Sequence, residues 1–216
     1  MTLQETIQRV SKSLVFLSVD HGNEGPGAGG FGSGFVVGAA GEIVTAAHLL
    51  RDATKVEARV LGSSRVSACS IIATDVAHDV ALLKADARDL LPMALWRGES
   101  VPVGREVGFM GFPHADIFQP PLVMTMRGIV GNRYRLGETE CYVVDANASE
   151  GMSGGPVFLA QSGEAIGLVG GRFDPGRTRA RLRGSAPSAI RDLPAERANI
   201  MFAPAIEYVL ALLKKK

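Results

Sequence analysis

The sequence predicts an all-β protein with two antiparallel lobes and a C-terminal helix. Short β-branched or apolar runs alternate with turn residues along most of the chain, a pattern typical of sandwiches and barrels. The 216 residues include 26 glycines but only three tyrosines and one tryptophan, which favours tight turns and short strands. Hydrophobic residues make up 46% and charged residues 21%, the balance of an ordinary folded protein.

The predicted strands fall into two series. The first series covers residues 13–19, 34–37, 43–45, 55–60, 67–75 and 80–84. After a connection at residues 96–104, the second series covers residues 106–110, 123–130, 140–145, 156–159, 165–169 and 200–203. We therefore expect an N-terminal lobe over residues 1–97, a C-terminal lobe over 98–203, and a helix with a basic tail over 204–216.

The C-terminal tail is predicted to be helical because its apolar residues share one helix face. Pro204 would stand in the first turn, with Ile206, Val209, Leu210 and Leu213 on the apolar face and lysines at the end. This helix is expected to pack across the outside of the lobes.

Two stretches interrupt the strand pattern and are predicted to be loops. The first is the glycine-rich segment 22–34, and the second is the arginine-rich segment 172–197. The second has little apolar content and is predicted to be mobile. Nucleic acid is disfavoured as its ligand, because the arginines lack aromatic stacking partners.

Charge, cysteines and apolar runs exclude several classes of protein. A net charge of +1 provides no overall field that attracts nucleic acid or an anionic membrane. Two cysteines, Cys69 and Cys141, exclude a dense disulfide framework, and we expect both to be reduced and buried. No membrane span is predicted, and the apolar run 14–17 is too short for a signal peptide, so a native start here would place the protein in the cytoplasm.

Two segments of the N-terminal lobe carry candidate catalytic residues. GSGFVV at residues 32–37 leads through a turn into IVTAAH, which ends at His48, and AHDVALLK carries Asp79 at the start of a buried strand. A lone histidine is more often structural than catalytic, and an aspartate at a strand start is usually a turn former. Asp79 could instead orient the imidazole ring of His48, provided that the fold brings the two together.

The third segment, EGMSGGPVF, is the most specific signal in the chain. Ser153 supplies a hydroxyl, Gly151 permits backbone amides to turn inward, and Gly154 and Gly155 leave room for a substrate. A serine in a glycine-rich turn is often only part of the turn. GxSGGP before an apolar strand is much rarer, which favours a nucleophilic serine here.

TAAH, HDVALL and GMSGGP, in the order His, Asp, Ser, resemble the chymotrypsin-like serine proteases, and most closely their HtrA (Deg) branch. GFMGFP at 108–113, RGIVGN at 127–132 and MFAPAIEYVLALL at 201–213 extend the resemblance. It implies two six-stranded antiparallel β-barrels with a C-terminal helix, and the protease domain alone, without a PDZ domain. Oligomeric state is not predicted.

The resemblance implies a serine endopeptidase that acts on protein or peptide substrates. Ser153 would be the nucleophile, His48 the general base and then acid, Asp79 the orienting carboxylate, and the amides of Gly151 and Ser153 the oxyanion hole. This chemistry needs no metal and no organic cofactor. The alternative is a catalytically silent protease fold that serves as a peptide-binding or scaffolding module, although silent relatives usually lose a triad residue.

The sequence departs from the resembling proteases near the nucleophile. Met152 stands where secreted relatives have aspartate and the HtrA branch usually has asparagine, which argues against activation by amino-terminal cleavage. By resemblance, Asn147 and Ala148 would form the bottom of the specificity pocket, without the carboxylate that selects lysine or arginine. The opposite wall would come from Val169, Gly170, Gly171 and Arg172. In the resembling branch the loop that corresponds to residues 172–197 borders this pocket, so the segment is expected to lie beside the substrate and to control access to it. Its arginines would suit an acidic trigger or an activating protein partner, and the alternative is a solvated surface loop without a role.

Overall fold

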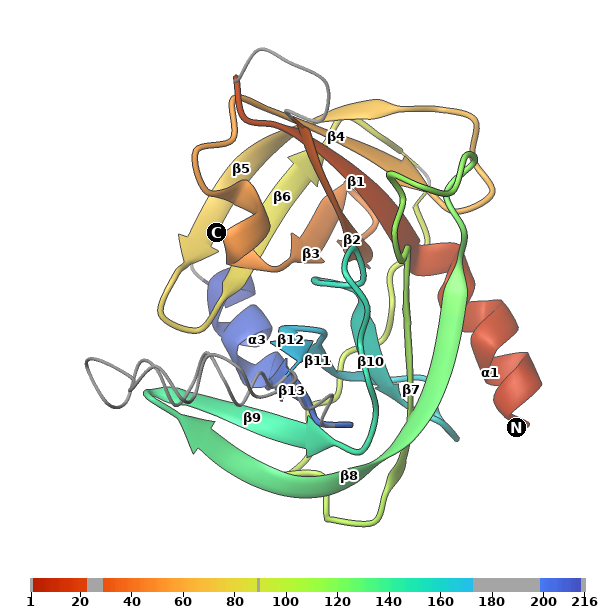
Figure 1. Ribbon diagram of the computed structural model, residues 1–216, viewed down its shortest axis with the longest axis vertical. Coiled ribbons are helices and arrows are strands. Elements are labelled where there is room, and N and C mark those ends of the chain that lie inside the picture. Colours follow the sequence, from red (N-terminus) through yellow and green to blue (C-terminus); the bar gives the residue numbers. More distant parts are fainter. Residues whose placement is uncertain (1, 23–28, 89, 173–198, 215–216) are drawn as a thin grey trace, which may run out of the picture.

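The computed structural model describes residues 2–22, 29–88, 90–172 and 199–214, of which residues 171 and 172 are described by backbone only. The chain is mostly β, as predicted. A closed barrel lies on one side of the molecule and a curled sheet on the other, with a helix near each end of the chain (Figure 1). The segment 173–197, which was predicted to control access to the site, lies outside the described residues.

The N-terminal barrel is closed because β1 pairs with strands on both of its sides. Its strand order is β1-β2-β3-β6-β5-β4, and β1 pairs antiparallel with β2 and with β4. Alternate side chains fill the interior, among them Leu17, Ile43 and Leu83, which are fully buried. The six strands are β1 (Leu14–Asp20), β2 (Gly29–Gly38), β3 (Glu42–Thr45), β4 (Lys55–Val60), β5 (Ser67–Asp75) and β6 (Val80–Ala85).

Strand β2 corrects the prediction that residues 22–34 form a loop. Residues 29–34 belong to the strand, and Gly29 pairs with Asp20 at the end of β1. Glycine has a low intrinsic preference for strands, so the composition of this segment indicated a loop. Pairing with β1 outweighs that preference here.

The C-terminal sheet contains the six predicted strands and one short additional strand, in the order β11-β10-β7-β8-β9-β13-β12. Its long strand β8 pairs first with β7 and then, after a register shift between Val130 and Asn132, with β9. The sheet therefore curls into a half-barrel (Figure 1). The strands are β7 (Glu106–Gly111), β8 (Met124–Leu136), β9 (Thr139–Val144), β10 (Pro156–Leu159), β11 (Ala165–Leu168), β12 (Gly171–Arg172) and β13 (Met201–Pro204).

Helix α1 (Leu3–Val10) was not predicted. It begins with a capping box in which the Thr2 hydroxyl accepts from Glu5 N and the Glu5 carboxylate accepts from Thr2 N. A short 3₁₀ helix, η1 (Ser11–Ser13), connects it to β1. The Arg9 guanidinium donates to the carbonyl of Ser162, so α1 is attached to the turn between β10 and β11. The first segment of the chain thus contacts the C-terminal lobe before it enters the N-terminal barrel.

Helix α3 (Ile206–Lys214) confirms the predicted C-terminal helix but begins later than expected. Pro204 lies in β13, opposite Cys141, rather than in the first helical turn. The fully buried face comprises Ile206, Val209 and Leu212, whereas Leu210 and Leu213 are half-buried. Contacts with β5, β6 and β11 place the helix against both lobes rather than across their outside. In the described part of the chain, no helix is long and apolar enough to cross a membrane.

One apolar cluster joins the two lobes. Phe35 and Val44 of the barrel, Met110 and Phe158 of the sheet, and Val209 of α3 all belong to it, and none of these side chains is more than 1% exposed. The two lobes are therefore packed through a shared core, which fixes the barrel relative to the sheet.

Tyr208 on α3 connects the helix to the hairpin turn between β5 and β6. Its ring stacks on His78 with 3.9 Å between the centroids, and its hydroxyl accepts from Glu140 N at 2.7 Å. We expect Tyr208→Ala to lower the free energy of unfolding by about 2–3 kcal/mol through lost stacking and burial. Tyr208→Phe keeps the ring and should cost about 1 kcal/mol. Urea denaturation measures both, and equal losses would contradict a contribution from the ring.

Candidate active site

Asp79 ends the tight turn between β5 and β6. Asp75 and Val80 form the last pair of the hairpin, and Asp79 has a φ of 56° in the left-handed region, which aspartate tolerates better than most residues. The carboxylate of Asp75 accepts from the backbone N–H of His78 at 3.1 Å and contacts its Nδ1 at 2.8 Å. The turn is therefore held by its own side chains as well as by the hairpin.

His48 lies in the 3₁₀ helix η2 (Ala47–Leu50), directly after β3. Strand β3 pairs with β6, and Thr45 lies opposite Ala81. The residues just after β3 and just before β6 consequently meet at the same end of the barrel. There the Asp79 carboxylate accepts from the backbone N–H of His48 at 2.8 Å and contacts Nδ1 of its ring at 2.8 Å.

The two contacts with Asp79 determine the orientation of the His48 ring and which of its nitrogens carries the hydrogen. An ionised carboxylate can only accept, so Nδ1 carries the hydrogen and Nε2 of a neutral ring is left with its lone pair. The His48 and Asp79 side chains are 41% and 31% exposed, so Nε2 belongs to a ring that solvent and ligands can reach. The geometry provides an oriented base at the end of the barrel.

Ser153 lies in the turn before β10, and this turn packs against the barrel. The N–H of Ser33 on β2 donates to the carbonyl of Ser153 at 2.9 Å. Gly154 has a φ of 83°, and a methyl group on it would lie 2.3 Å from the Thr45 hydroxyl and 2.8 Å from Ala46 N. The turn therefore touches the segment that leads into His48. Within the described residues the Ser153 hydroxyl forms no hydrogen bond, so the hydrogen bond predicted between this hydroxyl and His48 Nε2 is not formed in this structure. Such catalytic hydrogen bonds are often long when no substrate is bound.

The backbone around Gly151 leaves two amides available. Gly151 has a φ of 89°, and a methyl group on it would lie 2.3 Å from the carbonyl oxygen of Phe112, so only glycine fits. Met152 N donates to the carbonyl of Ser149 at 3.1 Å, and Gly154 N donates to that of Val169 at 2.7 Å. Among the residues that the structure describes, no acceptor is found for the N–H of Gly151 or of Ser153.

Met152 occupies the interior of the C-terminal lobe. Its side chain is 0% exposed and lies in an apolar cluster with Phe109, Val157 and Val169. The side chain therefore neither blocks the turn nor reaches the surface. It anchors the turn by apolar burial, where the resembling proteases have a polar residue.

Three of the residues predicted for the specificity pocket precede the serine turn in the chain or pair with it through backbone hydrogen bonds. Ala148 and Val169 are buried in the same apolar cluster as Met152, and Val169 exchanges backbone hydrogen bonds with Gly154 and Gly155. Asn147 is half-buried, and its Oδ1 is buried without a hydrogen-bond partner in the described part of the chain.

The remaining pocket residues lie beyond Val169. Gly170 N donates to the carbonyl of Phe202, and β12 continues this pairing, with Gly171 opposite Phe202 and Arg172 opposite Met201. The Arg172 side chain, which was predicted to form part of the opposite pocket wall, lies outside the part of the chain that the structure describes.

The cysteines do not compete with Ser153 as nucleophiles. Both are free: Cys141 is buried as predicted, whereas Cys69 is only half-buried. Desolvation raises the pKa of each thiol to about 11, assisted by Glu57 at Cys69 and by Glu140 and Asp79 at Cys141. Because the thiolate is the reactive form, both thiols are unreactive near neutral pH. No group of three or more potential metal ligands occurs among the described side chains.

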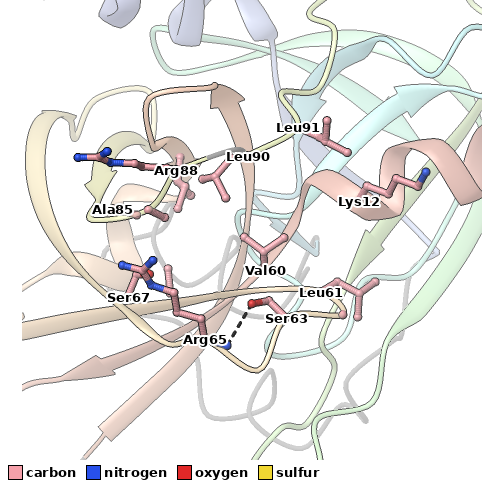
Figure 2. A pocket seen from close by; sticks show the side chains of 14 residues that line it. Lys12, Val60, Leu61, Ser63, Arg65, Ser67, Ala85, Arg88, Leu90 and Leu91 are labelled. Carbon is pink, nitrogen blue, oxygen red and sulfur yellow. Dashed lines mark hydrogen bonds between the residues drawn. The ribbon is translucent and has the colours of Figure 1, made fainter.

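A separate cavity of about 360 Å³ opens at the barrel surface (Figure 2). Apolar side chains, including Val60 and Leu90, form its wall, and Lys12, Arg65 and Arg88 stand around it. Neither His48 nor any other predicted site residue contributes to it.

A closed β-barrel packed on a curled sheet, with a histidine and aspartate pair on one and a glycine-rich serine turn on the other, defines a trypsin-like peptidase domain. The family model described as "Trypsin-like peptidase domain" matches residues 32–168, and the chain belongs to this family.

The relatives are HtrA and DegP-like serine proteases. A probable periplasmic serine endoprotease DegP-like from Pseudomonas fulva is 34% identical over 154 residues, which are 66% of this chain and 31% of that protein. Its counterpart from Pseudomonas savastanoi pv. phaseolicola is 32% identical over 164 residues, covering 70% of this chain and 33% of that protein. The chain thus spans about a third of the length of these curated relatives, in their protease portion.

Solved structures show the same fold. The HtrA-type protease AlgW with tripeptide superposes with a TM-score of 0.76 at 19% identity, covering 100% of this chain and 63% of that one. The serine endoprotease from Yersinia pestis gives a TM-score of 0.74 at 21% identity, covering 100% and 66%.

Because Met152 is buried in an apolar cluster, the free energy of unfolding should depend on the polarity of the side chain at this position. Met152→Leu keeps an apolar side chain of similar volume and should change the free energy of unfolding by less than about 1.5 kcal/mol. Met152→Asn introduces the residue typical of the HtrA branch but places an amide in an apolar core, which should cost about 1–3 kcal/mol. Thermal or urea unfolding measures both, and an equal or more stable Met152→Asn protein would contradict the apolar anchor.

Proposed function

We propose that the chain is a serine endopeptidase that uses Ser153, His48 and Asp79 as a catalytic triad. The observation that carries the proposal is the pair of hydrogen bonds that the Asp79 carboxylate accepts from His48, next to the turn that presents Ser153. An unactivated serine hydroxyl is a poor nucleophile and requires a base within reach. His48 Nε2 is the base that the geometry leaves available.

The proposed reaction proceeds through an acyl-enzyme. His48 Nε2 takes the proton from Ser153 as the hydroxyl oxygen attacks the peptide carbonyl carbon, and Asp79 stabilises the imidazolium that forms. The N–H groups of Gly151 and Ser153 donate hydrogen bonds to the carbonyl oxygen and stabilise the negative charge that develops on it. His48 then returns the proton to the leaving amine, and water releases the acyl group through the same steps in reverse.

The relatives support peptides as substrates. The proteins that the chain matches are named as serine endoproteases, and the AlgW structure contains a tripeptide. The printed names of the curated relatives call those proteins periplasmic. The cytoplasmic location of this chain stays a prediction.

The second candidate is a catalytically silent peptide-binding module. The observation in its favour is the open arrangement of the Ser153 hydroxyl, which makes no hydrogen bond within the described residues. The two candidates differ in one measurable property, which is covalent reaction of Ser153.

We expect a fluorophosphonate probe to label the wild-type protein and to leave Ser153→Ala unlabelled, with casein digestion lost in parallel. His48→Ala and Asp79→Ala should each lower turnover by about 10⁴-fold or more. The double variant His48→Ala with Ser153→Ala should be no slower than Ser153→Ala alone, because the three residues act as one unit.

His78 supplies the matched control for the triad. It makes the same pair of contacts with Asp75 that His48 makes with Asp79, with the same 2.8 Å distance at Nδ1. His78→Gln should retain labelling and turnover within about tenfold, the loss expected from a modest shift of the neighbouring turn. Labelling that survives Ser153→Ala, or a wild-type protein that is folded but never labelled, would favour the silent module.

The substrate side chain on the acyl side of the cleaved bond is expected to be small or medium in size and apolar. Among the predicted pocket residues with described side chains, Asn147, Ala148 and Val169, none carries the carboxylate that would pair with lysine or arginine. Mass spectrometry of a digested peptide library tests this expectation. Cleavage mainly after lysine or arginine would contradict it, and cleavage after acidic residues would indicate that Arg172 lines the pocket.

A further inference from the structure

Ser33 is the second residue of the GSGFVV segment at residues 32–37. It is not a member of the proposed triad. Its side chain is 0% exposed, although it stands on β2 at the face where the barrel meets the C-terminal sheet. Both hydrogen-bond partners of its hydroxyl belong to the C-terminal lobe. This buried hydroxyl therefore links the barrel to the C-terminal lobe beside the serine turn.

The direction of each hydrogen bond at Ser33 is fixed by its partners. Phe112 N can only donate, and it does so to Ser33 Oγ at 3.0 Å. The Gly151 carbonyl can only accept, so Ser33 Oγ donates its single hydrogen to that oxygen at 2.7 Å. The backbone N–H of Ser33 donates in addition to the carbonyl of Ser153 at 2.9 Å. Ser33 therefore holds the serine turn at two carbonyls.

Three consecutive peptide groups form the serine turn, and each is tethered by its carbonyl. The Glu150 carbonyl accepts from His114 N at 2.9 Å, and the Met152 carbonyl accepts from Gly155 N at 3.0 Å. The middle carbonyl, that of Gly151, is held by Ser33. Two tethers are backbone groups of the same lobe, whereas the middle one is a side chain from the other lobe.

These tethers determine where the available N–H groups point. In a trans peptide the N–H and the C=O point in opposite directions, so fixing the Glu150 and Met152 carbonyls aims the N–H groups of Gly151 and Ser153. The peptide between them sets their mutual orientation, and glycine at position 151, with its φ of 89°, offers little resistance to rotation of that peptide. That peptide is held at its N–H by the bond from Met152 N to the Ser149 carbonyl within the turn, and at its C=O by the Ser33 hydroxyl. The Ser33 hydroxyl is the side-chain hydrogen bond that opposes this rotation.

We propose that Ser33 is a positioning residue of the oxyanion hole: its hydroxyl locks the Gly151 peptide, so that the N–H groups of Gly151 and Ser153 converge on the substrate carbonyl oxygen. This inference rests on the proposed function. It also makes the hole dependent on lobe packing, because the lock crosses from the barrel to the C-terminal lobe. Donors that stabilise a transition state must be in place before the charge develops, which is what such a lock provides.

The test compares Ser33→Ala with Ser13→Ala. Ser13 is a matched control because its hydroxyl is also buried, also in the barrel lobe, and also donates to a carbonyl, that of Leu91, at 2.7 Å. For Ser33→Ala we expect kcat on a peptide substrate, and the rate of fluorophosphonate labelling, to fall about 10- to 100-fold with KM within about twofold, the scale of a misplaced catalytic group. Ser13→Ala should keep kcat within about threefold even where its unfolding midpoint falls as much as that of Ser33→Ala.

A second readout does not require activity. Hydrogen exchange measured on peptides covering residues 149–155 should be about tenfold faster in Ser33→Ala than in the wild type, because the Met152 N–H is protected only while the turn is locked, and unchanged in Ser13→Ala. Equal losses of kcat in the two variants, a change in KM alone, or unchanged exchange at 149–155 would overturn the inference. If the wild type shows no turnover and no labelling, the proposed function fails, and the exchange experiment alone decides whether Ser33 locks the turn.

Discussion

The apolar cluster between the lobes is the constraint on which the rest of the structure depends. The two halves of the candidate site are on different lobes. His48 and Asp79 lie at one end of the barrel, whereas Ser153 belongs to the turn before β10 of the C-terminal sheet. Neither lobe contains a complete site. Burial of side chains such as Phe35 and Phe158 in one shared core fixes the distance between the halves, because close-packed interiors resist small displacements.

Each half of the site is also ordered locally, by ordinary hairpin chemistry. The pairing of β3 with β6 brings His48 and Asp79 to one end of the barrel, so the carboxylate reaches both the backbone and the ring of the histidine. On the other lobe, two glycines with positive φ allow the serine turn to approach the barrel backbone closely. Hairpin register and glycine geometry thus carry much of the positioning that the chemistry requires.

The fold and the family could be predicted from sequence because their signals are local. All twelve predicted strands are found, since alternating apolar runs between turns depend little on distant contacts. Helix α1 was missed although Thr2 and Glu5 form a recognisable capping box and its apolar residues recur at helical spacing, because the segment has only 8 residues and is mostly polar. The extent of β2 and the start of α3 were misjudged where pairing with β1 and β9 outweighed glycine and proline preferences. The hydrogen bonds from Ser33 and His114 to the serine turn could not be predicted, because both residues are far from that turn in the sequence.

The side chains that hold the serine turn indicate how its geometry is maintained in this chain. Met152 is anchored by apolar burial and the Gly151 carbonyl by a neutral hydroxyl, so neither tether involves an ion pair. Apolar burial and neutral hydrogen bonds are not weakened by ionic screening as an ion pair is, and they do not depend on a charged side chain. The turn is therefore ordered by the same process that forms the core, since Met152 is buried only when the C-terminal sheet has formed and Ser33 reaches Gly151 only when the lobes are packed together. Ordering of the serine turn and assembly of the two lobes are, in this arrangement, one event.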